Sequence, residues 1–229
     1  MKIGIICAIE TELAPFLQKL EEERTAEKAS LTYHIGKIGS HDIIAVYCGV
    51  GKVNAAIATQ TMIDAFAVET VINSGVAGGM DPALKVFDTV IATEAAYHDV
   101  AEGILTEYHP RMKSIYFASD ADLVERSKKL FSGKQTGHKI CWGRMVTGEA
   151  FIEDDGRQEI IDRLNPLSVD METGSIAHVC LANDIPFIAI RSISDTADHS
   201  GLGSFEQNCA RGAVIACDIT LELISDLQR

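Results

Sequence analysis

The chain lacks the features that accompany several large classes of protein function. None of its apolar stretches reaches the ~20 residues that cross a bilayer. Glu10 and Glu12 interrupt the apolar N-terminal segment, so a signal peptide is not expected. The chain has 20 lysine and arginine residues against 33 acidic ones, a net charge of −13, and no basic stripe. Nucleic acids and membranes are therefore not expected as partners, and we expect a soluble, cytoplasmic protein.

Motifs for cofactors and metals are also missing. The six cysteines form no CxxC pair and lie mostly in apolar segments, which favours buried free thiols in a reducing compartment. Segments 49–51 and 75–79 are glycine-rich but contain neither GxGxxG nor GxxxxGKS/T, which disfavours nicotinamide cofactors and P-loop nucleotides. His98, Asp99 and His109 do not have a standard zinc spacing. We therefore expect no cofactor and no metal.

Apolar segments of strand length alternate with segments of helical period, and 47% of the residues are hydrophobic, enough for a sizeable core. The expected strands cover residues 2–9, 31–37, 41–48, 70–74, 86–96, 138–146, 167–171 and 187–193, the expected helices cover 11–22, 52–66, 121–131, 158–164, 172–183 and 204–227, and a glycine-rich loop is expected at 75–79. This alternation predicts an α/β fold with a central mixed, twisted sheet flanked by helices on both sides. No linker, proline cluster or repeat divides the chain, so residues 1–229 are expected to form a single domain.

Charged side chains come at the ends of two expected strands. Glu172 directly follows one of them, and Arg191 and Asp195 come at the end of the other. Ligands of α/β proteins bind at the carboxyl ends of the strands. Two carboxylates and an arginine at such a place suggest chemistry on a small polar molecule.

Several motifs, in order along essentially the whole chain, carry a family resemblance. They are residues 1–12 (MKIGIICAIETE), 49–54 (GVGKVN), 73–79 (NSGVAGG), 148–152 (GEAFI), and Met171-Glu172 with 191–195 (RSISD). Together they resemble the 5'-methylthioadenosine/S-adenosylhomocysteine nucleosidase family of the nucleoside phosphorylase/nucleosidase superfamily. The resemblance implies a phosphorylase/hydrolase-like fold with a partly closed, bent sheet. It also implies hydrolysis of the N-glycosidic bond of these adenine nucleosides, which yields adenine and a thioribose product and serves nucleoside catabolism and methionine salvage.

Cleavage of that bond needs an acid and a base. The purine leaves poorly unless its N7 accepts a proton, and the ribosyl carbon becomes oxocarbenium-like and needs a nucleophile. By resemblance, Asp195 is the acid at N7 and Glu12 is the base that activates water. From the residues alone, Asp195 could equally be a helix N-cap. Glu12 could be an ordinary first-turn glutamate that is favourable with the helix dipole.

The same resemblance assigns residues to the ribose. Glu172 would bind the 2'-hydroxyl and place negative charge near the developing oxocarbenium, Met171 would pack against the sugar, and Arg191 would lie near Glu12 and the water. The alternatives are helix-start electrostatics for Glu172 and a surface ion pair for Arg191. The end of an apolar strand makes the surface pair less favourable.

The remaining implied contacts surround the base and the sugar. Phe151 would stack on adenine, the backbone of Ile152 would read the Watson–Crick edge, and Ser194 would lie beside the base. The resemblance also gives the pocket Val50, Val76, Ala77, Gly78 and Phe205. A lone phenylalanine more often belongs to a core, but the loop-like sequence around Phe151 would expose it.

Residues 102–112 depart from the resemblance. Family members commonly have an aromatic-rich loop here that crosses a dimer interface and covers the neighbour's 5'-substituent. This chain has Ile104 and Tyr108 instead, with His109 and Arg111 close by. We expect a homodimer that buries the segment. The preferred 5'-group stays open, since apolar residues would suit a methylthio group and a cation would suit the carboxylate of homocysteine.

Two other functions remain on the same fold. A phosphate-dependent purine nucleoside phosphorylase needs cations for phosphate, yet segment 75–79 has none and Lys52 is the only cation near segment 49–51. A non-catalytic nucleoside-binding protein would not need both a water base and a proton donor. The residues therefore favour a hydrolase.

Overall fold

The computed structural model describes residues 1–101, 103–109, 112–134, 137–153, 156–196 and 202–227. In chain order its elements are β1 (Lys2–Cys7), α1 (Glu10–Leu17), β2 (Glu21–Lys28), β3 (Leu31–Ile38), β4 (His41–Tyr47), α2 (Lys52–Phe66), β5 (Thr70–Gly79), β6 (Thr89–Tyr97), α3 (Ile104–Tyr108), β7 (Tyr116–Ala118), α4 (Ala121–Phe131), β8 (Ile140–Thr147), α5 (Arg157–Leu164), β9 (Ser168–Asp170), α6 (Thr173–Ala182), β10 (Phe187–Asp195) and α7 (Leu202–Asp226). Among the helices in these ranges, none is long and apolar enough to cross a membrane.

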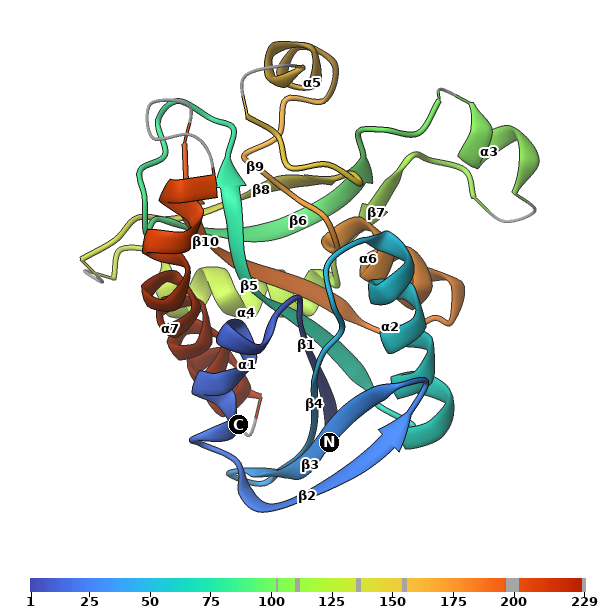
Figure 1. Ribbon diagram of the computed structural model, residues 1–229, viewed down its shortest axis with the longest axis vertical. Coiled ribbons are helices and arrows are strands. Elements are labelled where there is room, and N and C mark those ends of the chain that lie inside the picture. Colours follow the sequence, from blue (N-terminus) through green and yellow to red (C-terminus); the bar gives the residue numbers. More distant parts are fainter. Residues whose placement is uncertain (102, 110–111, 135–136, 154–155, 197–201, 228–229) are drawn as a thin grey trace.

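The strands form one mixed sheet that partly closes on itself. The hydrogen-bonded order is β10-β6-β8-β9-β5-β1-β4-β3-β2, with β7 joined to β6 and a further pairing of β10 with β5. β5 is parallel to β1 and β10, whereas the pairings β5–β9 and β10–β6 are antiparallel. Because β10 bonds to both β5 and β6, the path from β5 through β9, β8 and β6 to β10 closes into a ring, and β1, β4, β3 and β2 extend from it (Figure 1). The expected mixed, partly closed sheet is confirmed.

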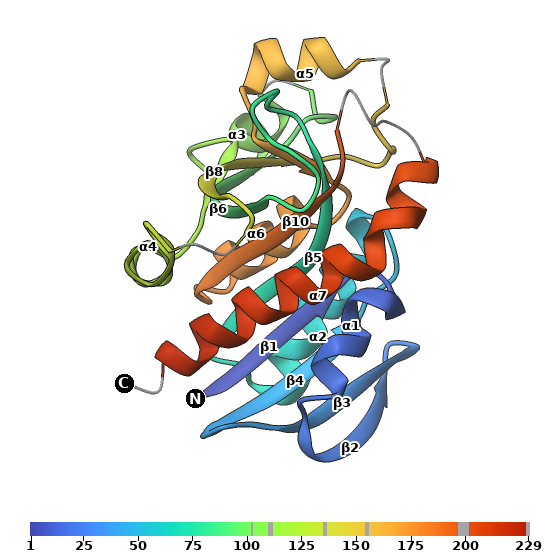
Figure 2. The ribbon, with the colours of Figure 1, turned by 90° about the vertical axis from the view of Figure 1, so that its left-hand side faces the viewer.

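Helices cover both sides of this sheet. α1 and α7 pack together on one side, where α4 also contacts α7, and α2 and α6 pack together on the other. Figure 2 shows α7 running along the sheet, where it contacts β5 and β10. Neighbouring residues of β5 enter different cores: Ile72 packs in the cluster that contains Leu223 of α7, and Val71 in the cluster that contains Ala177 of α6. This division follows from the alternation of side chains along a strand.

The expected helix 11–22 is wrong in its second half. α1 ends at Leu17, and β2 follows as an exposed strand paired with β3. The β2 sequence EEERTAEK has no apolar alternation because almost none of its side chains is buried, so its pattern carries no strand signal. α3 and β7 were not expected either; they have five and three residues, too few for a readable period.

The glycine-rich segment 75–79 is not the expected loop. β5 continues through it to Gly79 and is paired on one side with β10 and on the other with β9. A Cβ atom on Gly75 would lie 2.5 Å from the carboxyl carbon of Glu12 and 2.8 Å from Nη1 of Arg191. Only glycine fits this position of the strand, because the side chains of Glu12 and Arg191 occupy the space that a Cβ atom would need.

Candidate active site

A pocket of about 240 Å³ opens where the ends of β1, β9 and β10 meet the second half of β5. It brings together every residue that the sequence analysis placed in a site, namely Glu12, Val50, Val76, Ala77, Gly78, Phe151, Ile152, Met171, Glu172, Arg191, Ser194, Asp195 and Phe205. Its lining also includes Ala8, Ile9, Ala150, Val169, Asp170 and Leu202, which the sequence analysis did not anticipate.

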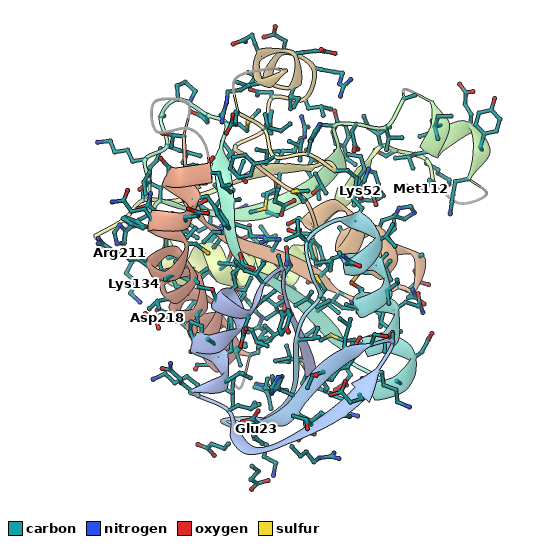
Figure 3. The ribbon with its side chains drawn as sticks, in the orientation of Figure 1. Glu23, Lys52, Met112, Lys134, Arg211 and Asp218 are labelled. Carbon is teal, nitrogen blue, oxygen red and sulfur yellow. The ribbon has the colours of Figure 1, made fainter. Side chains whose placement is uncertain are left out.

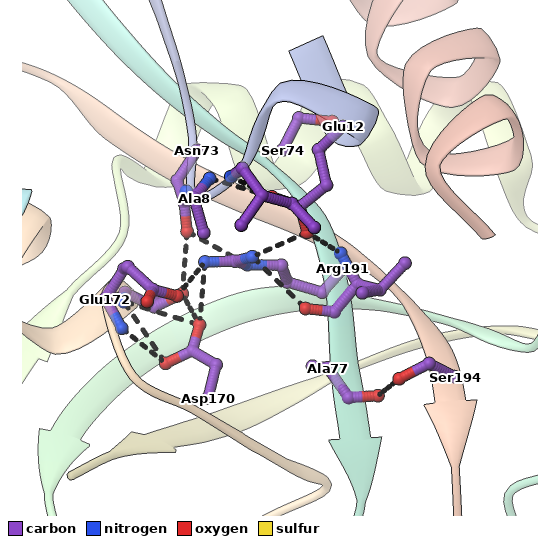
Figure 4. Close-up of polar contacts among 12 residues, drawn as sticks. Ala8, Glu12, Asn73, Ser74, Ala77, Asp170, Glu172, Arg191 and Ser194 are labelled. Atoms are coloured by element: carbon purple, nitrogen blue, oxygen red, sulfur yellow. Dashed lines mark hydrogen bonds and ion pairs between the residues drawn. The ribbon is translucent and has the colours of Figure 1, made fainter. Parts of the chain in front are cut away.

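Arg191 is the centre of the polar side of the pocket (Figure 4). It is 1% exposed, and its Nη2 atom lies 3.1 Å from Oδ2 of Asp170 and 3.2 Å from Oε2 of Glu172. Its Nη1 atom lies 3.5 Å from Oε1 of Glu12 and donates to the Val76 carbonyl at 3.1 Å. Burial alone would lower the pKa of the guanidinium, but the three carboxylates outweigh burial and raise it. Arg191 is thus a permanent buried cation, and the surface ion pair considered for it is wrong.

Glu12 is held by donors on both carboxylate oxygens. Oε2 accepts hydrogen bonds from the backbone N–H groups of Ala8, at 2.7 Å, and Ile9, at 3.3 Å. Oε1 accepts one from the N–H of Val76 at 2.7 Å. Glu12 is the third residue of α1 and reaches back to the N-cap Ile9, as in a capping box. The side chain therefore has the local helix-start role and also lines the pocket, where it is 2% exposed.

Glu172 links the glycine turn before α2 to the arginine. Its Oε1 accepts a hydrogen bond from the N–H of Gly51 at 3.0 Å, and its Oε2 accepts one from Arg191 at 3.2 Å. Burial raises the pKa of Glu172 to about 7, against the lowering effect of Arg191. Glu172 precedes the first residue of α6, but its side chain faces the pocket rather than capping that helix.

Two polar residues of this network escaped the sequence analysis. Asp170 accepts hydrogen bonds from the N–H and hydroxyl of Thr173, so it supplies the cap of α6 as well as a partner for Arg191. Asn73 accepts from Nε of Arg191 at 3.1 Å and donates to the Ile6 carbonyl at 2.9 Å. The signal available for Asp170 was its place two residues before the expected helix 172–183, which favours a role at the helix start and does not indicate the ion pair with Arg191.

Asp195 is the last residue of β10, across from Gly78 of β5. It is 2% exposed, and Oδ1 accepts a hydrogen bond of 2.7 Å from the Ser194 hydroxyl. Burial raises the pKa of the Asp195 carboxyl, although the bond from Ser194 lowers it. α7 begins only at Leu202, so the N-cap alternative for Asp195 is wrong.

Part of the pocket lining is aromatic and apolar. Phe151 is 41% exposed, and its ring centroid lies 6.2 Å from that of Phe205, with the planes at 77°. Phe151 is therefore not a core residue, and one face of the pocket presents an aromatic surface to a ligand. Phe205 comes from the first turn of α7, and Asn208 on the same helix donates to the Ser194 carbonyl at 2.9 Å. α7 thereby fixes the end of β10 next to these rings.

Lys52 is the cation next to the glycine turn 49–51, but its ammonium pairs with Asp99 outside the pocket. It starts α2 (Figure 3), and its Nζ lies 2.8 Å from both carboxylate oxygens of Asp99. The Lys52 N–H donates to Glu149, whose own N–H donates to Asp99. This network joins the turn at Gly51 to the loop that carries Phe151. Arg191 is the one cationic side chain that lines the pocket among the described residues.

Other sequence-level candidates lie outside the pocket. Among the described residues, no group of three or more His, Cys, Asp or Glu side chains could hold a metal. The His98 ring is buried, and burial lowers its pKa. In the segment that departs from the family resemblance, Ile104 and Tyr108 are 50% and 78% exposed. Arg111 lies outside the described residues.

Comparisons with known proteins give matches over nearly the whole chain. The family model of the phosphorylase superfamily matches residues 2–225. A 5'-methylthioadenosine/S-adenosylhomocysteine nucleosidase from Colwellia psychrerythraea is 36% identical over 100% of this chain and 97% of its own. The corresponding protein of a Geobacillus species is 34% identical over the full length of both chains.

Solved structures show the same fold. The 5'-methylthioadenosine/S-adenosylhomocysteine nucleosidase from S. pneumoniae, bound to the transition-state inhibitor MT-ImmA, superimposes with a TM-score of 0.90 and 30% identity, covering 99% of this chain and 100% of its own. The Colwellia psychrerythraea nucleosidase in complex with adenine gives 0.89 and 33% identity, over 98% and 95% of the two chains. Futalosine hydrolase of Helicobacter pylori gives 0.89 at 26% identity, over 99% and 98%.

Proposed function

The chain belongs to the phosphorylase superfamily and, within it, to the 5'-methylthioadenosine/S-adenosylhomocysteine nucleosidase family, and we propose that it hydrolyses the N-glycosidic bond of these two nucleosides. The products are adenine and the corresponding thioribose. Water is the nucleophile, and acid assistance at the purine makes adenine a better leaving group. No cofactor takes part in the proposed reaction.

Asp195 is the proposed acid at purine N7. A donor at this position must hold its proton near neutral pH, and burial raises the pKa of the Asp195 carboxyl in that direction. The Ser194 hydroxyl bonds to Oδ1 and orients the carboxyl. Phe151 is proposed to stack on the base, with the Ile152 backbone at its Watson–Crick edge and Phe205 beside them; Val76, Ala77 and Gly78 form the floor of the pocket.

Glu12 is the proposed water base. Its carboxylate lines the pocket and is fixed by three backbone N–H groups, so its orientation costs nothing at the moment of reaction. Arg191 lies 3.5 Å away and is proposed to help position the water. Proton transfer from water to Glu12 leaves hydroxide character on the oxygen that attacks the ribosyl carbon.

Glu172 is proposed to hold the ribose 2'-hydroxyl. Its carboxylate lies between the Gly51 N–H and Arg191, near the place where positive charge develops on the sugar. Met171 and Val50 line the pocket next to it and offer apolar surface to the sugar and its 5'-group. These contacts would be strongest in the oxocarbenium-like transition state.

One observation favours hydrolysis over phosphorolysis. Arg191 is the one cation in the described lining, and its guanidinium already faces Glu12, Asp170, Glu172 and two other acceptors. A phosphate dianion would approach three carboxylates with no cation left to hold it. The test is incubation with 5'-methylthioadenosine in phosphate-free buffer. Release of adenine at an undiminished rate supports the hydrolase, and strict phosphate dependence contradicts it.

The same experiment separates catalysis from simple binding. A non-catalytic nucleoside-binding protein would bind 5'-methylthioadenosine and return it unchanged. The site instead holds an acid candidate and a base candidate in the lining of one pocket, an arrangement that binding alone does not require.

We also propose that the protein is a cytoplasmic homodimer, active in methionine salvage, and that residues 1–229 form a single domain. Ile104 and Tyr108 support the dimer because they expose apolar surface on α3. A single sheet whose strands run from Lys2 to Asp195, with α7 packed against it, supports the single domain.

A further inference from the structure

Arg157 is a buried arginine beside the pocket. Its guanidinium donates to backbone carbonyls rather than to a carboxylate. It is 7% exposed and is the first residue of α5. Its Nη1 donates to the Gly79 carbonyl at 2.6 Å, its Nε to the Glu153 carbonyl at 3.0 Å, and its Nη2 to the Ile152 carbonyl at 3.4 Å. Burying a guanidinium costs free energy unless its N–H groups are hydrogen-bonded. The three carbonyl acceptors offset this cost and fix Arg157 in one position.

The acceptors of Arg157 belong to two different parts of the site. Gly79 ends β5 and follows Gly78, which lies across from Asp195 in the sheet. Ile152 lines the pocket from the loop next to Phe151. One guanidinium thus ties the loop to the strand pair that carries Asp195. The planar guanidinium spreads its donors over three nitrogen atoms and so reaches acceptors on both parts, whereas a lysine has its three donors on one nitrogen.

The charge of Arg157 also acts on Asp195. Burial raises the pKa of the Asp195 carboxyl, and the Ser194 hydrogen bond and the positive charge of Arg157 lower it. Among the described residues, Arg157 is the charged group that shifts this pKa. Loss of the charge would therefore raise the pKa of Asp195 further.

We propose that Arg157 is a positioning residue that clamps the adenine-binding loop at Ile152 onto the end of β5, and so sets the place of the purine relative to Asp195. The inference rests on the proposed function and adds a residue to the same site. Arg157 acts through the loop and the acid and does not itself contact substrate.

The test compares Arg157→Met, Arg157→Lys and a control, Arg163→Met. Arg163 lies on the same helix, is exposed, and donates to the His98 carbonyl away from the pocket, so its replacement removes the same charge without touching the clamp. Adenine affinity is measured by calorimetry, and kcat/KM for 5'-methylthioadenosine is measured as a function of pH.

We expect Arg157→Met to weaken adenine binding about 10-fold, since it removes charge-assisted bonds to both parts of the site. It should also move the alkaline fall of kcat/KM to higher pH. Arg157→Lys should keep the wild-type pH profile and still bind adenine more weakly, because its charge remains and its fork is lost. Arg163→Met should match the wild type in both measurements.

Adenine affinities in Arg157→Met and Arg157→Lys equal to that of Arg163→Met would overturn the clamp. If Arg157→Met does not fold, the comparison of Arg157→Lys with Arg163→Met decides in the same way. If the wild type released no adenine from 5'-methylthioadenosine, the proposed function would fail, and the adenine affinities alone would still decide the role of Arg157.

Discussion

The Nη2 atom of Arg191 lies 3.2 Å from Oε2 of Glu172, and both side chains are almost fully buried, at 1% and 3% exposed. The pair joins the middle of β10 to the start of α6, the helix that directly precedes this strand in the chain. Asp170 and Glu12 share the same guanidinium. The arginine therefore holds together the acidic side of the pocket as well as orienting single residues.

Replacing Arg191 should destabilise the protein strongly. Arg191→Met leaves three buried carboxylates without their cation, and breaking a buried charge network by removing one partner costs about 3–5 kcal/mol. The free energy of unfolding in urea measures the loss. Arg126→Met is the control: Arg126 pairs with Asp122 on α4 and with Asp226 on α7, but all three side chains are partly or largely exposed, so the loss of stability should be much smaller. Equal stability of the two variants would contradict the role given to Arg191.

Replacing Asp195 should slow bond cleavage strongly and leave adenine binding nearly unchanged. Asp195→Asn cannot give a carboxyl proton to N7 but can still form a hydrogen bond, so turnover should fall by at least ~10²-fold while adenine affinity stays close to that of the wild type. Glu12→Gln should lose turnover similarly through lost water activation. Steady-state kinetics and adenine calorimetry check both variants. A folded Asp195→Asn protein with wild-type turnover would exclude Asp195 as the acid.

The activity should depend on pH through the Asp195 proton. The acid works only when protonated, so on the alkaline side of the profile kcat/KM should fall as pH rises through the raised pKa of Asp195. Ser194→Ala removes a hydrogen bond that lowers this pKa, and the fall should therefore move to higher pH. The pH profiles of kcat/KM for the two proteins give the shift. A fall that moves to lower pH, or does not move, would argue against this coupling.

The proposed dimer should depend on the α3 segment. Ile104→Glu places a charge on apolar surface that is 50% exposed in the single chain, and it should convert the dimer to monomer. Light scattering at micromolar concentration reports the mass. Val214→Glu, at a 46% exposed position on α7, is the matched control and should remain dimeric. A wild-type monomer with full activity would refute the proposed assembly.

The residues that the sequence analysis placed in a site line one pocket, and several of them come from the ends of strands. Glu172 follows β9 and Asp195 ends β10, and the topology of an α/β sheet brings such strand ends together; Arg191 lies in the middle of β10, which continues past the expected end of the apolar run. Glu12 follows β1 in the same way. The burial of Arg191 and the exposure of Phe151 were left open by the sequence, since both depend on what packs against them from elsewhere in the chain.

The parts that could not be predicted have physical reasons. β2 is a polar edge strand that pairs with β3 through its backbone. Because none of its side chains is buried, its sequence does not show the apolar alternation typical of a strand. Segment 75–79 has loop composition, but its glycines serve the close approach of Glu12 and Arg191 to β5. Asp170 has two roles, a helix cap and an ion pair, and only the cap is visible in the sequence.

The identity of the sugar product tests the central claim most directly. The protein is incubated with 5'-methylthioadenosine and an excess of inorganic phosphate, and the sugar product is identified by mass spectrometry. With Glu12 in the pocket lining and no free cation for phosphate in the described lining, we expect adenine and free 5-methylthioribose, at a rate that phosphate does not change. Formation of 5-methylthioribose 1-phosphate, or a rate proportional to phosphate, would contradict hydrolysis.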